Sequence, residues 1–404
     1  MRIVLNYLAA SETAKTGIGH YTAELFRCLC EQANDDIIDA FPGALGQRAQ
    51  AAWMRFRRAR LSASDASPGE GSTPSRPTIR RQLFHGVRAC GRVSRQVLFR
   101  QLCRWKKYQL YHEPNFLPLP CDCPTAATLH DLSPLFHPEW HPAERVEQFE
   151  KHFRRCLSQC IHFFTVSEFV RQEVIRTLGL SPAQVTRTYN GIRSNLAPLP
   201  SAEVKEILRR LDLPPRYLLH VGTIEPRKNL MTLLRAYCSL PEQVRSSWPL
   251  LLVGGWGWNS ADVANFLDNG ARQRGVLYRR YVPEGDLSAL YNGARALVFP
   301  SLYEGFGLPP VEMLACGGAV LASTAGAVAE TVGRQAHLIE PLDLDGWRRA
   351  MQRVVVDDDW WRQLRRGAEE VAKPFTWERC AADTLRVYRM LCGEGKEETQ
   401  PLAA

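Results

Sequence analysis

Short apolar runs alternate with amphipathic stretches along the whole 404-residue chain, and this alternation limits the available folds more than any other feature. The apolar runs have the length and residue types of buried strands, and the stretches between them follow the 3.6-residue period of a helix. Strands that alternate with helices form parallel sheets covered by helices on both faces. The strands predicted in this way are 3–6, 37–41, 109–112, 125–129, 162–166, 185–189, 217–221, 250–253, 276–281, 296–299, 319–322 and 337–340.

The chain is longer than the roughly 250–300 residues at which single hydrophobic cores stop growing, so two domains are expected. A stretch rich in turn residues between 190 and 215 separates the predicted strands into two sets. Each set is long enough for one doubly wound sheet. We therefore predict an α/β protein with one Rossmann-like domain over residues 1–195 and a second over residues 196–375.

No apolar run approaches the roughly 18 residues that a membrane-spanning helix requires. The stretch 1–6 has the pattern of a strand rather than that of a signal peptide. These features predict a cytoplasmic protein that the standard secretory route does not export.

The cysteines and histidines do not have the spacing of a metal site. The twelve cysteines are scattered along the chain, which predicts reduced and mostly buried thiols. His137 and His141 stand four residues apart, but Pro138 and Pro142 break the helix that would align them. We therefore expect no structural metal.

Basic charge is concentrated in one part of the chain. Residues 48–107 contain fifteen Lys and Arg against two acidic residues, whereas the net charge of the whole chain is only +9. Within this part, 61–77 has the composition of a mobile loop, and 88–107 has that of a basic amphipathic helix. The helix either lies on an anionic membrane surface or packs with a solvated basic face. No nucleic-acid-binding motif accompanies the charge, so no nucleic-acid partner is expected.

Glu304 and Glu312 lie in the most informative segment, Phe-Pro-Ser-Leu-Tyr-Glu-Gly-Phe-Gly-Leu-Pro-Pro-Val-Glu, residues 299–312. Glycines favour a turn after Glu304, and the two prolines suit the first turn of a helix, so Glu312 is predicted in the opening turn. The amides near Phe306, Gly307 and Leu308 are then free to meet an anion. The alternative without a functional role is that Glu304 is a solvated loop residue and that Glu312 only favours a helix N-terminus.

The string Pro-Ser-x-x-Glu-Gly-Phe-Gly-Leu-Pro-x-x-Glu resembles the E-x7-E signature of retaining glycosyltransferases of family four. The resemblance implies the GT-B architecture, two Rossmann-like domains that face each other across a cleft. It places Glu304 beside the hydroxyls of the donor sugar and Glu312 beside the nucleotide ribose, with Gly305 in the anion-binding turn. It also implies that the last helix, 376–392, packs back on the first domain.

Arg227 and Lys228 lie in Gly-Thr-Ile-Glu-Pro-Arg-Lys-Asn, residues 222–229, just before a predicted helix. Cations are unfavourable at a helix N-terminus by some tenths of a kcal/mol unless an anion offsets them. This string resembles the family's G-x-x-x-x-R-K-N motif, in which the two cations stabilise the leaving nucleoside diphosphate. The alternative is a pair of solvated surface charges.

Three further loops resemble parts of the family. Gly17 and Gly19 correspond to its glycine-rich loop after the first strand, although the full dinucleotide fingerprint is absent. His130, in His-Asp-Leu-Ser-Pro, resembles the residue that faces the sugar in mannosyl- and rhamnosyltransferases of bacterial surface polysaccharides. The loop at Val282 resembles the one whose backbone reads the nucleotide base. Asp343-Leu-Asp345 resembles the D-x-D motif of another glycosyltransferase fold, but its place before a helix predicts capping.

The resemblance implies a retaining hexosyltransferase that acts in polysaccharide or lipopolysaccharide synthesis. The donor is expected to be GDP-mannose or GDP-rhamnose, the acceptor a growing glycan or lipid-linked glycan, and no metal or cofactor is required. Two enzymatic alternatives stay open, a glycoside hydrolase that uses two carboxylates and a sugar-nucleotide epimerase. A third is a catalytically idle scaffold held at a membrane by its basic flank.

Overall fold

A computed structural model of the chain describes residues 1–11, 17–43 and 94–393. The described chain divides into two compact units. The first comprises residues up to 128 together with 152–163 and the chain from 381 onward, and the second comprises 129–151 and 164–380. The predicted mobile loop 61–77, most of the basic segment and the tail after residue 393 lie outside the described residues.

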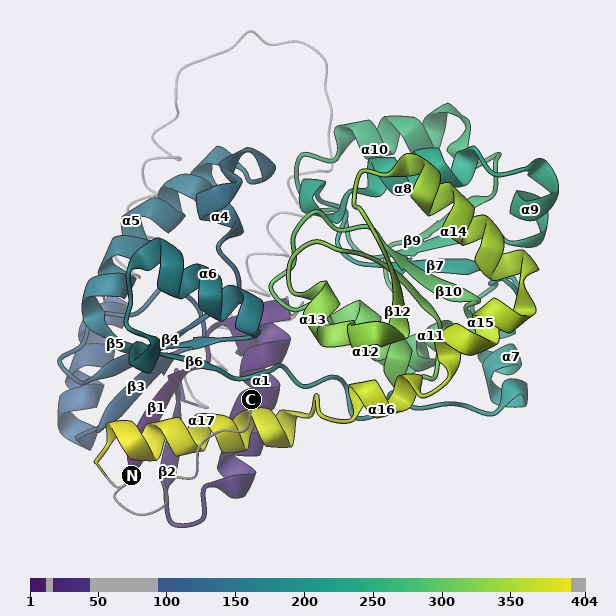
Figure 1. Cartoon of the computed structure of the whole chain (residues 1–404). Helices are drawn as coiled ribbons and strands as arrows, with labels where there is room; N and C mark the ends of the chain where they lie inside the picture. Colours follow the sequence, from purple (N-terminus) through teal and green to yellow (C-terminus); the bar gives the residue numbers. More distant parts are fainter. Residues whose placement is uncertain (12–16, 44–93, 394–404) are drawn as a thin grey trace, which may run out of the picture. The chain divides into compact units, whose positions relative to one another are not determined.

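Every strand predicted from the sequence is present, and their ends differ from the prediction by no more than a few residues (Figure 1). The strands form two six-stranded sheets, in which the pairs β1–β2, β1–β3, β7–β10 and β7–β8 are parallel. The predicted α/β fold class is therefore confirmed. The strands are β1 (Arg2–Asn6), β2 (Ile37–Phe41), β3 (Leu110–Glu113), β4 (Thr125–Leu129), β5 (Cys160–Thr165), β6 (Val185–Arg187), β7 (Leu218–Val221), β8 (Leu250–Val253), β9 (Val276–Arg279), β10 (Ala296–Phe299), β11 (Val320–Ser323) and β12 (Ala336–Ile339).

Each sheet has one place where the direction of strand addition reverses. The first sheet has the order β2-β1-β3-β4-β5-β6, so its reversal lies between β1 and β3. The second has the order β12-β11-β10-β7-β8-β9, which is the Rossmann order, and its reversal lies between β7 and β10. Open α/β sheets bind ligands beyond the carboxyl ends of the strands at such a switch point. The loops after these four strands are therefore the places to search for a site.

Helices cover the strands of the second sheet in two groups, with α8 beside α10 and α14, and α11 beside α7 and α12 (Figure 1). Its core combines the sheet with α8 and α14, and the indole of Trp347 is fully buried there. The helices are α1 (Gly17–Gln32), α4 (Ser133–Phe136), α5 (Ala143–Gln159), α6 (Glu168–Leu178), α7 (Ser201–Arg210), α8 (Leu230–Cys238), α9 (Glu242–Ser247), α10 (Ala261–Phe266), α11 (Leu287–Gly293), α12 (Leu308–Ala315), α13 (Val328–Val332), α14 (Leu344–Val356), α15 (Asp358–Arg365), α16 (Ala368–Ala372) and α17 (Trp377–Leu391). Short single turns are η1 (Ala9–Ser11), η2 (Pro138–Trp140), η3 (Pro182–Gln184), η4 (Pro226–Lys228), η5 (Leu267–Ala271), η6 (Glu284–Asp286) and η7 (Gly333–Gln335).

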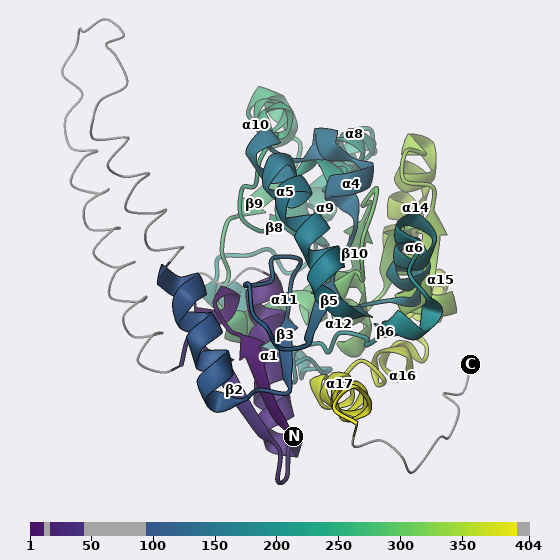
Figure 2. The same cartoon turned by 90° about the vertical axis from the view of Figure 1, so that its left-hand side faces the viewer.

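Residues 94–106 form a helix that lies beside the first sheet, next to β2 (Figure 2). It packs through Phe99 and Cys103, which share a core cluster with residues of β1, β2 and β3. Of the apolar residues in this basic amphipathic helix, Leu102 packs against the same cluster, whereas Val97, Leu98 and Trp105 are exposed, Trp105 to 75%. The part of the predicted helix before residue 94 lies outside the described residues.

The last helix, α17, carries a tyrosine that joins a buried polar network in the first unit. The hydroxyl of Tyr388 lies 2.5 Å from Nδ1 of His112 on β3, and Nε2 of this histidine lies 2.8 Å from Oγ1 of Thr128 on β4. All three residues are buried. A polar side chain of α17 therefore finds its partners at the ends of strands that lie far away in the sequence.

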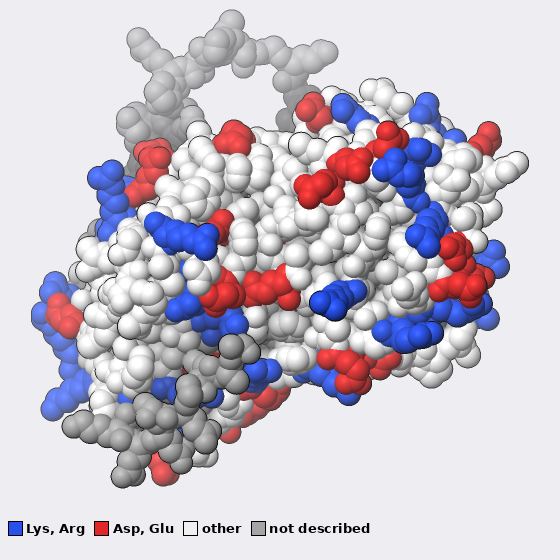
Figure 3. All heavy atoms as spheres, in the orientation of Figure 1, with Lys and Arg blue, Asp and Glu red and all other residues white. Residues whose placement is uncertain are grey.

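Other sequence predictions can be checked in the same way. All cysteines within the described residues are free, and most are buried. Asp343 caps α14 by accepting the amide of Gly346 at 2.8 Å, as predicted for this D-x-D sequence. Over the described ranges, no helix combines the length and the apolar character needed to cross a bilayer. On the face drawn in Figure 3, Lys and Arg side chains lie among Asp and Glu side chains instead of gathering in one patch.

Candidate active site

Arg227 and Lys228 follow β7, at the switch point of the second sheet. They occupy η4, and Asn229 then takes a left-handed conformation (φ 54°) from which α8 begins. An asparagine tolerates this conformation better than most residues. Asn229 is held there because its side-chain nitrogen Nδ2 donates to the carbonyl oxygens of Pro300 and Pro341, at 3.0 and 2.6 Å. The turn therefore fixes both cations at the carboxyl end of the sheet.

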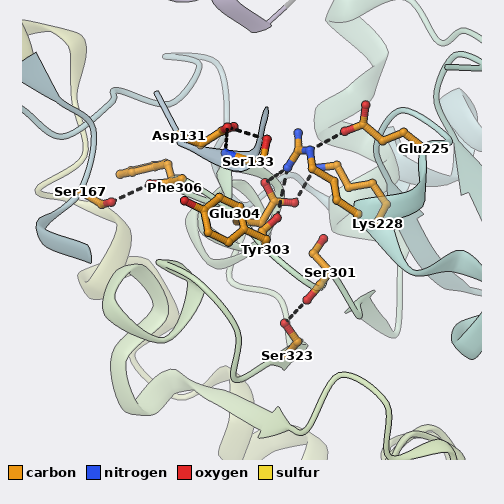
Figure 4. Close-up of polar contacts among 12 residues, drawn as sticks. Asp131, Ser133, Ser167, Glu225, Lys228, Ser301, Tyr303, Glu304, Phe306 and Ser323 are labelled. Carbon is orange, nitrogen blue, oxygen red and sulfur yellow. Dashed lines mark hydrogen bonds and ion pairs between the residues drawn. The ribbon is translucent and has the colours of Figure 1, made fainter. Parts of the chain in front are cut away.

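Glu304 follows β10, the strand next to β7, and its carboxylate meets both cations (Figure 4). Lys228 Nζ donates to Oε1 at 2.5 Å, and Arg227 Nη1 donates to Oε2 at 2.7 Å. Arg227 also pairs through Nε with Oε1 of Glu225 at 2.6 Å. The structure thus brings Glu304 to two cations that lie more than seventy positions before it in the sequence.

The carboxylate of Glu304 is buried, with only 6% of the residue exposed. Burial alone would raise its pKa, because desolvation disfavours the charged form, but the positive charges of Arg227 and Lys228 outweigh this effect and lower the pKa to about 2. Glu304 is therefore ionised at neutral pH. The sequence indicated that the two cations need an anion at this helix start, and in the structure Glu304 supplies it.

The loop around Glu304 is held by its backbone. Leu302 donates its amide to Arg227 O at 2.7 Å, and Glu304 O accepts the amide of Ala327 at 2.9 Å. Ser167 Oγ donates to Gly305 O at 2.6 Å (Figure 4). These bonds place the carboxylate without using its own oxygens, which stay available to the two cations.

Gly305 has a steric role in the same loop. A Cβ at this position would lie 1.9 Å from the backbone oxygen of His130, which no side chain can tolerate. The predicted site residue His130 thus lies against the Glu304 loop through its main chain. Any larger residue at position 305 would push the two segments apart.

Glu312 lies just past the opening turn of its helix, so this prediction is wrong by one position. The helix α12 begins at Leu308, because Gly307 takes a left-handed conformation (φ 87°) as its N-cap, and the prolines fill the first turn. Glu312 therefore falls in the second turn and is buried, which excludes the bland reading of an acidic residue at the helix start. Its Oε1 pairs with Arg193, and its Oε2 accepts the hydroxyl of Tyr291 at 2.6 Å.

The amides ahead of α12 are placed as the sequence predicted. Within the described part of the chain, the backbone N–H groups of Phe306, Gly307 and Leu308 have no protein acceptor. Unpaired amides at a helix N-terminus, together with the positive end of the helix dipole, attract an anion. They lie on the same loop as Glu304, so the carboxyl end of the sheet combines side-chain cations with unpaired amides.

The remaining predicted site residues are distributed over both units. Gly17 and Gly19 lie in the first turn of α1, in the first unit, while the residues just before them lie outside the described ranges. Val282 lies in the loop between β9 and η6, as predicted for a loop that precedes a helix. Glu284, two residues later, shares Arg193 with Glu312 through an ion pair of 3.2 Å. This arginine thus connects the Val282 loop to the second glutamate.

Sequence reasoning missed Arg193 and Glu225 as members of the site. Arg193 lies in the stretch that the sequence marked as an interdomain break, where only turn residues drew attention. Glu225 stands within the Gly-Thr-Ile-Glu-Pro-Arg-Lys-Asn string itself, and its position two residues before a cation was the available signal. A cavity of about 410 Å³ lies elsewhere, between β12, α14 and α15, and none of the predicted site residues lines it.

Comparison with known proteins identifies the family of this chain. The family described as "Glycosyltransferase Family 4" matches residues 45–196, and "Glycosyl transferases group 1" matches residues 205–371. "O-antigen chain mannosyltransferase B" of Escherichia coli is 36% identical over 289 residues, which cover 71% of this chain and 75% of the relative. The chain belongs to glycosyltransferase family four. It is therefore a glycosyltransferase that uses a nucleotide-sugar donor and a glycan acceptor, and the resemblance inferred from the motifs is confirmed.

Two further relatives are less similar to this chain. "Serotype-specific mannosyltransferase WbdA" of Escherichia coli is 28% identical over 282 residues, which cover 68% of this chain but only 34% of that relative. "O-antigen chain mannosyltransferase RfbU" of Salmonella typhimurium is 26% identical over 228 residues, or 56% of this chain and 60% of the relative. The chain therefore spans three quarters of its 36%-identical relative and about a third of WbdA.

Solved structures agree on the fold. Sucrose-phosphate synthase from Thermosynechococcus elongatus superposes with a TM-score of 0.69 at 22% identity, over 97% of this chain and 99% of the other. WaaG, a glycosyltransferase involved in lipopolysaccharide biosynthesis, gives a TM-score of 0.67 at 12% identity, over 95% and 99% of the two chains. At these identities the likeness shows the GT-B fold alone, which is the predicted fold class.

Proposed function

We propose that this family-four glycosyltransferase transfers mannose or rhamnose from a GDP-sugar to a growing bacterial polysaccharide or lipopolysaccharide glycan, with retention at the anomeric carbon. The observation that carries the proposal is the cluster of Arg227, Lys228 and Glu304 at the switch point of the second sheet. The names of its relatives, O-antigen mannosyltransferases of Escherichia coli and Salmonella, support the sugar and the acceptor class.

The cluster suits the departure of a nucleoside diphosphate. When the bond to the sugar breaks, negative charge develops on the β-phosphate, and preorganised donors around that charge lower the barrier. Arg227 and Lys228 supply two such donors, and the amides of Phe306, Gly307 and Leu308 supply more. Because these groups already stand at the sheet's carboxyl end, they need little rearrangement during the reaction.

Glu304 has two roles in this proposal. Without a phosphate at the cluster its carboxylate neutralises Arg227 and Lys228, and a bound diphosphate would compete for the same cations. Once the cations turn to the phosphate, the ionised carboxylate is free to accept hydrogen bonds from hydroxyls of the donor sugar. A carboxylate is an acceptor with several lone pairs, so it can hold more than one hydroxyl.

We assign the nucleotide's other contacts by the same reasoning. Each carboxylate oxygen of Glu312 has a protein partner, but a carboxylate oxygen accepts more than one hydrogen bond. Glu312 is thus able to bind the ribose hydroxyls while Arg193 and Tyr291 hold it in place. The backbone at Val282 would read the base, His130 would face the sugar, and Gly17 with Gly19 would bind the donor through their backbone.

The test begins with a panel of nucleotide sugars that contains GDP-mannose, GDP-rhamnose, UDP-glucose and dTDP-rhamnose. Purified protein is mixed with each, and thermal stabilisation and donor hydrolysis are measured. We expect the GDP-sugars to stabilise the protein and labelled mannose or rhamnose to pass to an oligomannoside acceptor with retained configuration, as read by NMR. Sugar released without a nucleotide donor would instead indicate a glycoside hydrolase, and an altered sugar on an intact nucleotide would indicate an epimerase. An absence of turnover with every donor would favour the third alternative, a catalytically idle scaffold.

The variants Glu304→Ala and Lys228→Ala connect the activity to the cluster. Both are expected to abolish transfer while the circular-dichroism spectrum stays that of the folded protein. Lys373→Ala is the matched control, because Lys373 also pairs with a glutamate, Glu370, at 2.6 Å, but on the exposed surface. Near-normal transfer by both cluster variants would overturn the proposal.

We also propose that residues 1–195 form the acceptor domain, residues 196–375 the donor domain, and that 376–392 packs on the former. The two family matches, which end at 196 and begin at 205, support the division. The contact between Tyr388 and His112 supports the assignment of the last helix. Limited proteolysis is the check: cleavage between 196 and 205 should give two stable fragments, which stay associated under native conditions because 376–392 packs on the first domain.

The basic flank 88–107 provides a further proposal, contact with an anionic membrane. Its support lies in residues 94–107, where the exposed Val97, Leu98 and Trp105 stand among basic side chains. Lys106 Nζ lies 4.9 Å from the ring centroid of Trp105. Aromatic and basic residues on one exposed helix suit a lipid headgroup region. Unchanged binding to anionic liposomes after Trp105→Ser combined with Lys106→Ser would discard this part of the proposal.

A further inference from the structure

A second polar cluster in the second unit surrounds a buried histidine. From the sequence alone, this histidine is a candidate only as a metal ligand, and its surroundings in the sequence do not suit that role. His141 stands between η2 and α5 in extended backbone (φ −113°, ψ 152°), and only 6% of it is exposed. Its Nε2 lies 3.0 Å from Oγ of Ser133, and this hydroxyl lies 2.7 Å from Oδ1 of Asp131 (Figure 4 shows Ser133 and Asp131). The three side chains thus form a chain of hydrogen bonds.

The chain fixes the tautomer of the imidazole. The single hydroxyl proton of Ser133 is donated to the carboxylate of Asp131, which also accepts the amide of Ser133 at 2.9 Å. Ser133 Oγ can then only accept from His141, so Nε2 carries the proton. A neutral imidazole with its proton on Nε2 has an unprotonated Nδ1, which is a hydrogen-bond acceptor.

Nδ1 of His141 is buried, and among the described residues it has no hydrogen-bond partner. A buried acceptor without a partner loses its hydrogen bonds to water and gains none in return. Such atoms are therefore rare in folded proteins, and they call for a donor that arrives from outside. This site is more specific than an isolated unpaired atom, because the hydrogen bonds of Ser133 and Asp131 fix the tautomer in which Nδ1 has a lone pair.

The surroundings of His141 connect it to the proposed site. The charged groups that act on its pKa are Arg145, Asp131, Glu225 and Arg227, two of which belong to the cluster at η4. Burial is the main cause that lowers the pKa of His141, with the cations adding to it and the carboxylates opposing it. The ring therefore stays neutral at neutral pH, and Nδ1 keeps its lone pair.

An aromatic wall completes this cluster. The ring of Trp258 lies 5.9 Å from the imidazole, centroid to centroid, and its Nε1 donates to Trp140 O at 2.7 Å. The guanidinium of Arg145 lies 4.6 Å above the same indole. Trp258 belongs to the loop after β8, which is the strand next to β7 in the second sheet. The indole of Trp258 thus lies beside the imidazole, on the loop that follows β8.

We propose that Nδ1 of His141 accepts a hydrogen bond from a hydroxyl group of a carbohydrate substrate bound beside Arg227, and that Ser133 and Asp131 are positioning residues which hold the imidazole in the required tautomer. The proposal rests on the proposed function and deepens it, since it assigns a substrate-hydroxyl contact that none of the motifs supplies. The hydroxyl belongs either to the donor sugar or to the acceptor glycan, and the test distinguishes the two.

Two substitutions of His141 separate its nitrogen atoms. His141→Gln places an amide near Nε2 and keeps a partner for Ser133, but leaves no acceptor at Nδ1, whereas His141→Asn places an amide near Nδ1. With GDP-mannose and an oligomannoside, we expect His141→Gln to lower kcat/KM about 10-fold, which corresponds to one lost hydrogen bond to a substrate group. His141→Asn should recover most of that loss. Equal activity of His141→Gln and the wild type would overturn the inference.

Deoxy substrates identify the source of the hydroxyl. If the hydroxyl is on the donor sugar, a deoxy GDP-mannose should lose the same factor with the wild type, and the loss should not add to that of His141→Gln. If it is on the acceptor, a deoxy oligomannoside should show this pattern, and donor hydrolysis without acceptor should be unchanged by the variant. Full additivity with every deoxy substrate would overturn the inference even if the variant proved unstable in long assays.

A double-mutant cycle tests the positioning role of Ser133. Ser133→Ala should lower kcat/KM in the wild type, because the ring can then change tautomer, and should have no further effect in His141→Gln. A purely structural role would lower both by the same factor and would contradict the inference. If the wild type transfers no sugar from any donor of the panel, the proposed function itself is wrong. If the wild type is active and His141→Gln has the same kcat/KM, only the inference about His141 is wrong.

Discussion

Two buried glutamates, one at the switch point of each sheet, have opposite protonation states. Glu304 follows β10 and meets two cations, whereas Glu113 ends β3 and accepts hydrogen bonds from the neutral side chains of Asn6 and Tyr111, at 2.6 and 2.5 Å. Both are almost inaccessible, with 6% and 3% of the residue exposed. The cations lower the pKa of Glu304 to about 2, while burial raises the pKa of Glu113 to about 8.

The difference shows that burial and position in the fold do not decide the charge of a carboxyl group. Desolvation raises the pKa in both places, and the neutral donors around Glu113 oppose it too weakly. Only full charges at hydrogen-bond distance reverse the balance. The first switch point therefore carries a carboxylic acid at neutral pH, and the second carries an anion within a cationic cluster.

The largest expected effect concerns activity and tests whether the charge of Glu304 matters. Glu304→Gln removes the charge with little change in shape, so transfer should fall by about 10²-fold to 10³-fold, as for other groups that act on charge in a transition state. Glu113→Gln is the matched control, since glutamine resembles the protonated acid, and should change transfer by less than about 10-fold. Comparable losses in the two variants, measured as kcat/KM, would remove the contrast.

A smaller effect concerns the pH dependence of stability. The pKa of Glu113 is raised from 4.5 to about 8, so its contribution is fully present below about pH 4.5 and is lost as the pH rises towards 8. The pKa of Glu304 is lowered to about 2, so its contribution is present above about pH 4.5 and is lost as the pH falls towards 2. The two glutamates thus act in separate pH windows.

Denaturant unfolding between pH 5 and pH 8 isolates the first window. Glu113→Gln should remove up to about 1.4 kcal/mol of stability change per pH unit, the slope of one proton. Glu304→Gln should leave the slope in this range as it is in the wild type. An unchanged slope in Glu113→Gln would mean that this group is ionised in the folded protein.

The smallest expected effect concerns the neutral partner of Glu113. Tyr111→Phe removes one hydrogen bond between uncharged groups, so the free energy of unfolding at pH 6 should fall by about 1 kcal/mol. Tyr237→Phe is a control in the second unit, where the hydroxyl donates to backbone carbonyls instead of a carboxyl group. A loss of several kcal/mol in Tyr111→Phe at pH 6 would indicate an ionised acceptor.

Individual residues show which parts of the fold can be predicted from the sequence. All strands were predicted, because buried strands bounded by turn residues leave a clear local pattern, and the prediction of a capping role for Asp343 is confirmed. The helix that holds Glu312 begins where its prolines predicted, with Gly307 as N-cap, but Glu312 itself lies one position past the first turn. Phe99 and Cys103, the buried residues of helix 94–106, were not identified from the sequence, because they find their partners on three distant strands.

The site was predicted as a set of residues, not as a set of contacts. The motifs gave Glu304, Arg227 and Lys228 because their spacing and their neighbours are local features of the chain. That the carboxylate would neutralise the cations was not predicted, since the strands that carry them are adjacent only in the folded sheet. Arg193 and His141 were missed for the same reason, because their partners lie far from them in sequence.

The sequence by itself determined the order of strands and helices, the family and the chemical types available at each loop, because these depend on short-range patterns of apolar, turn and charged residues. The tertiary structure alone decided which loops meet, which carboxyl group is charged and which histidine nitrogen is left with a lone pair. Electrostatic and hydrogen-bond energies depend on distances of a few ångströms and on exclusion of water. Only the folded chain sets those distances.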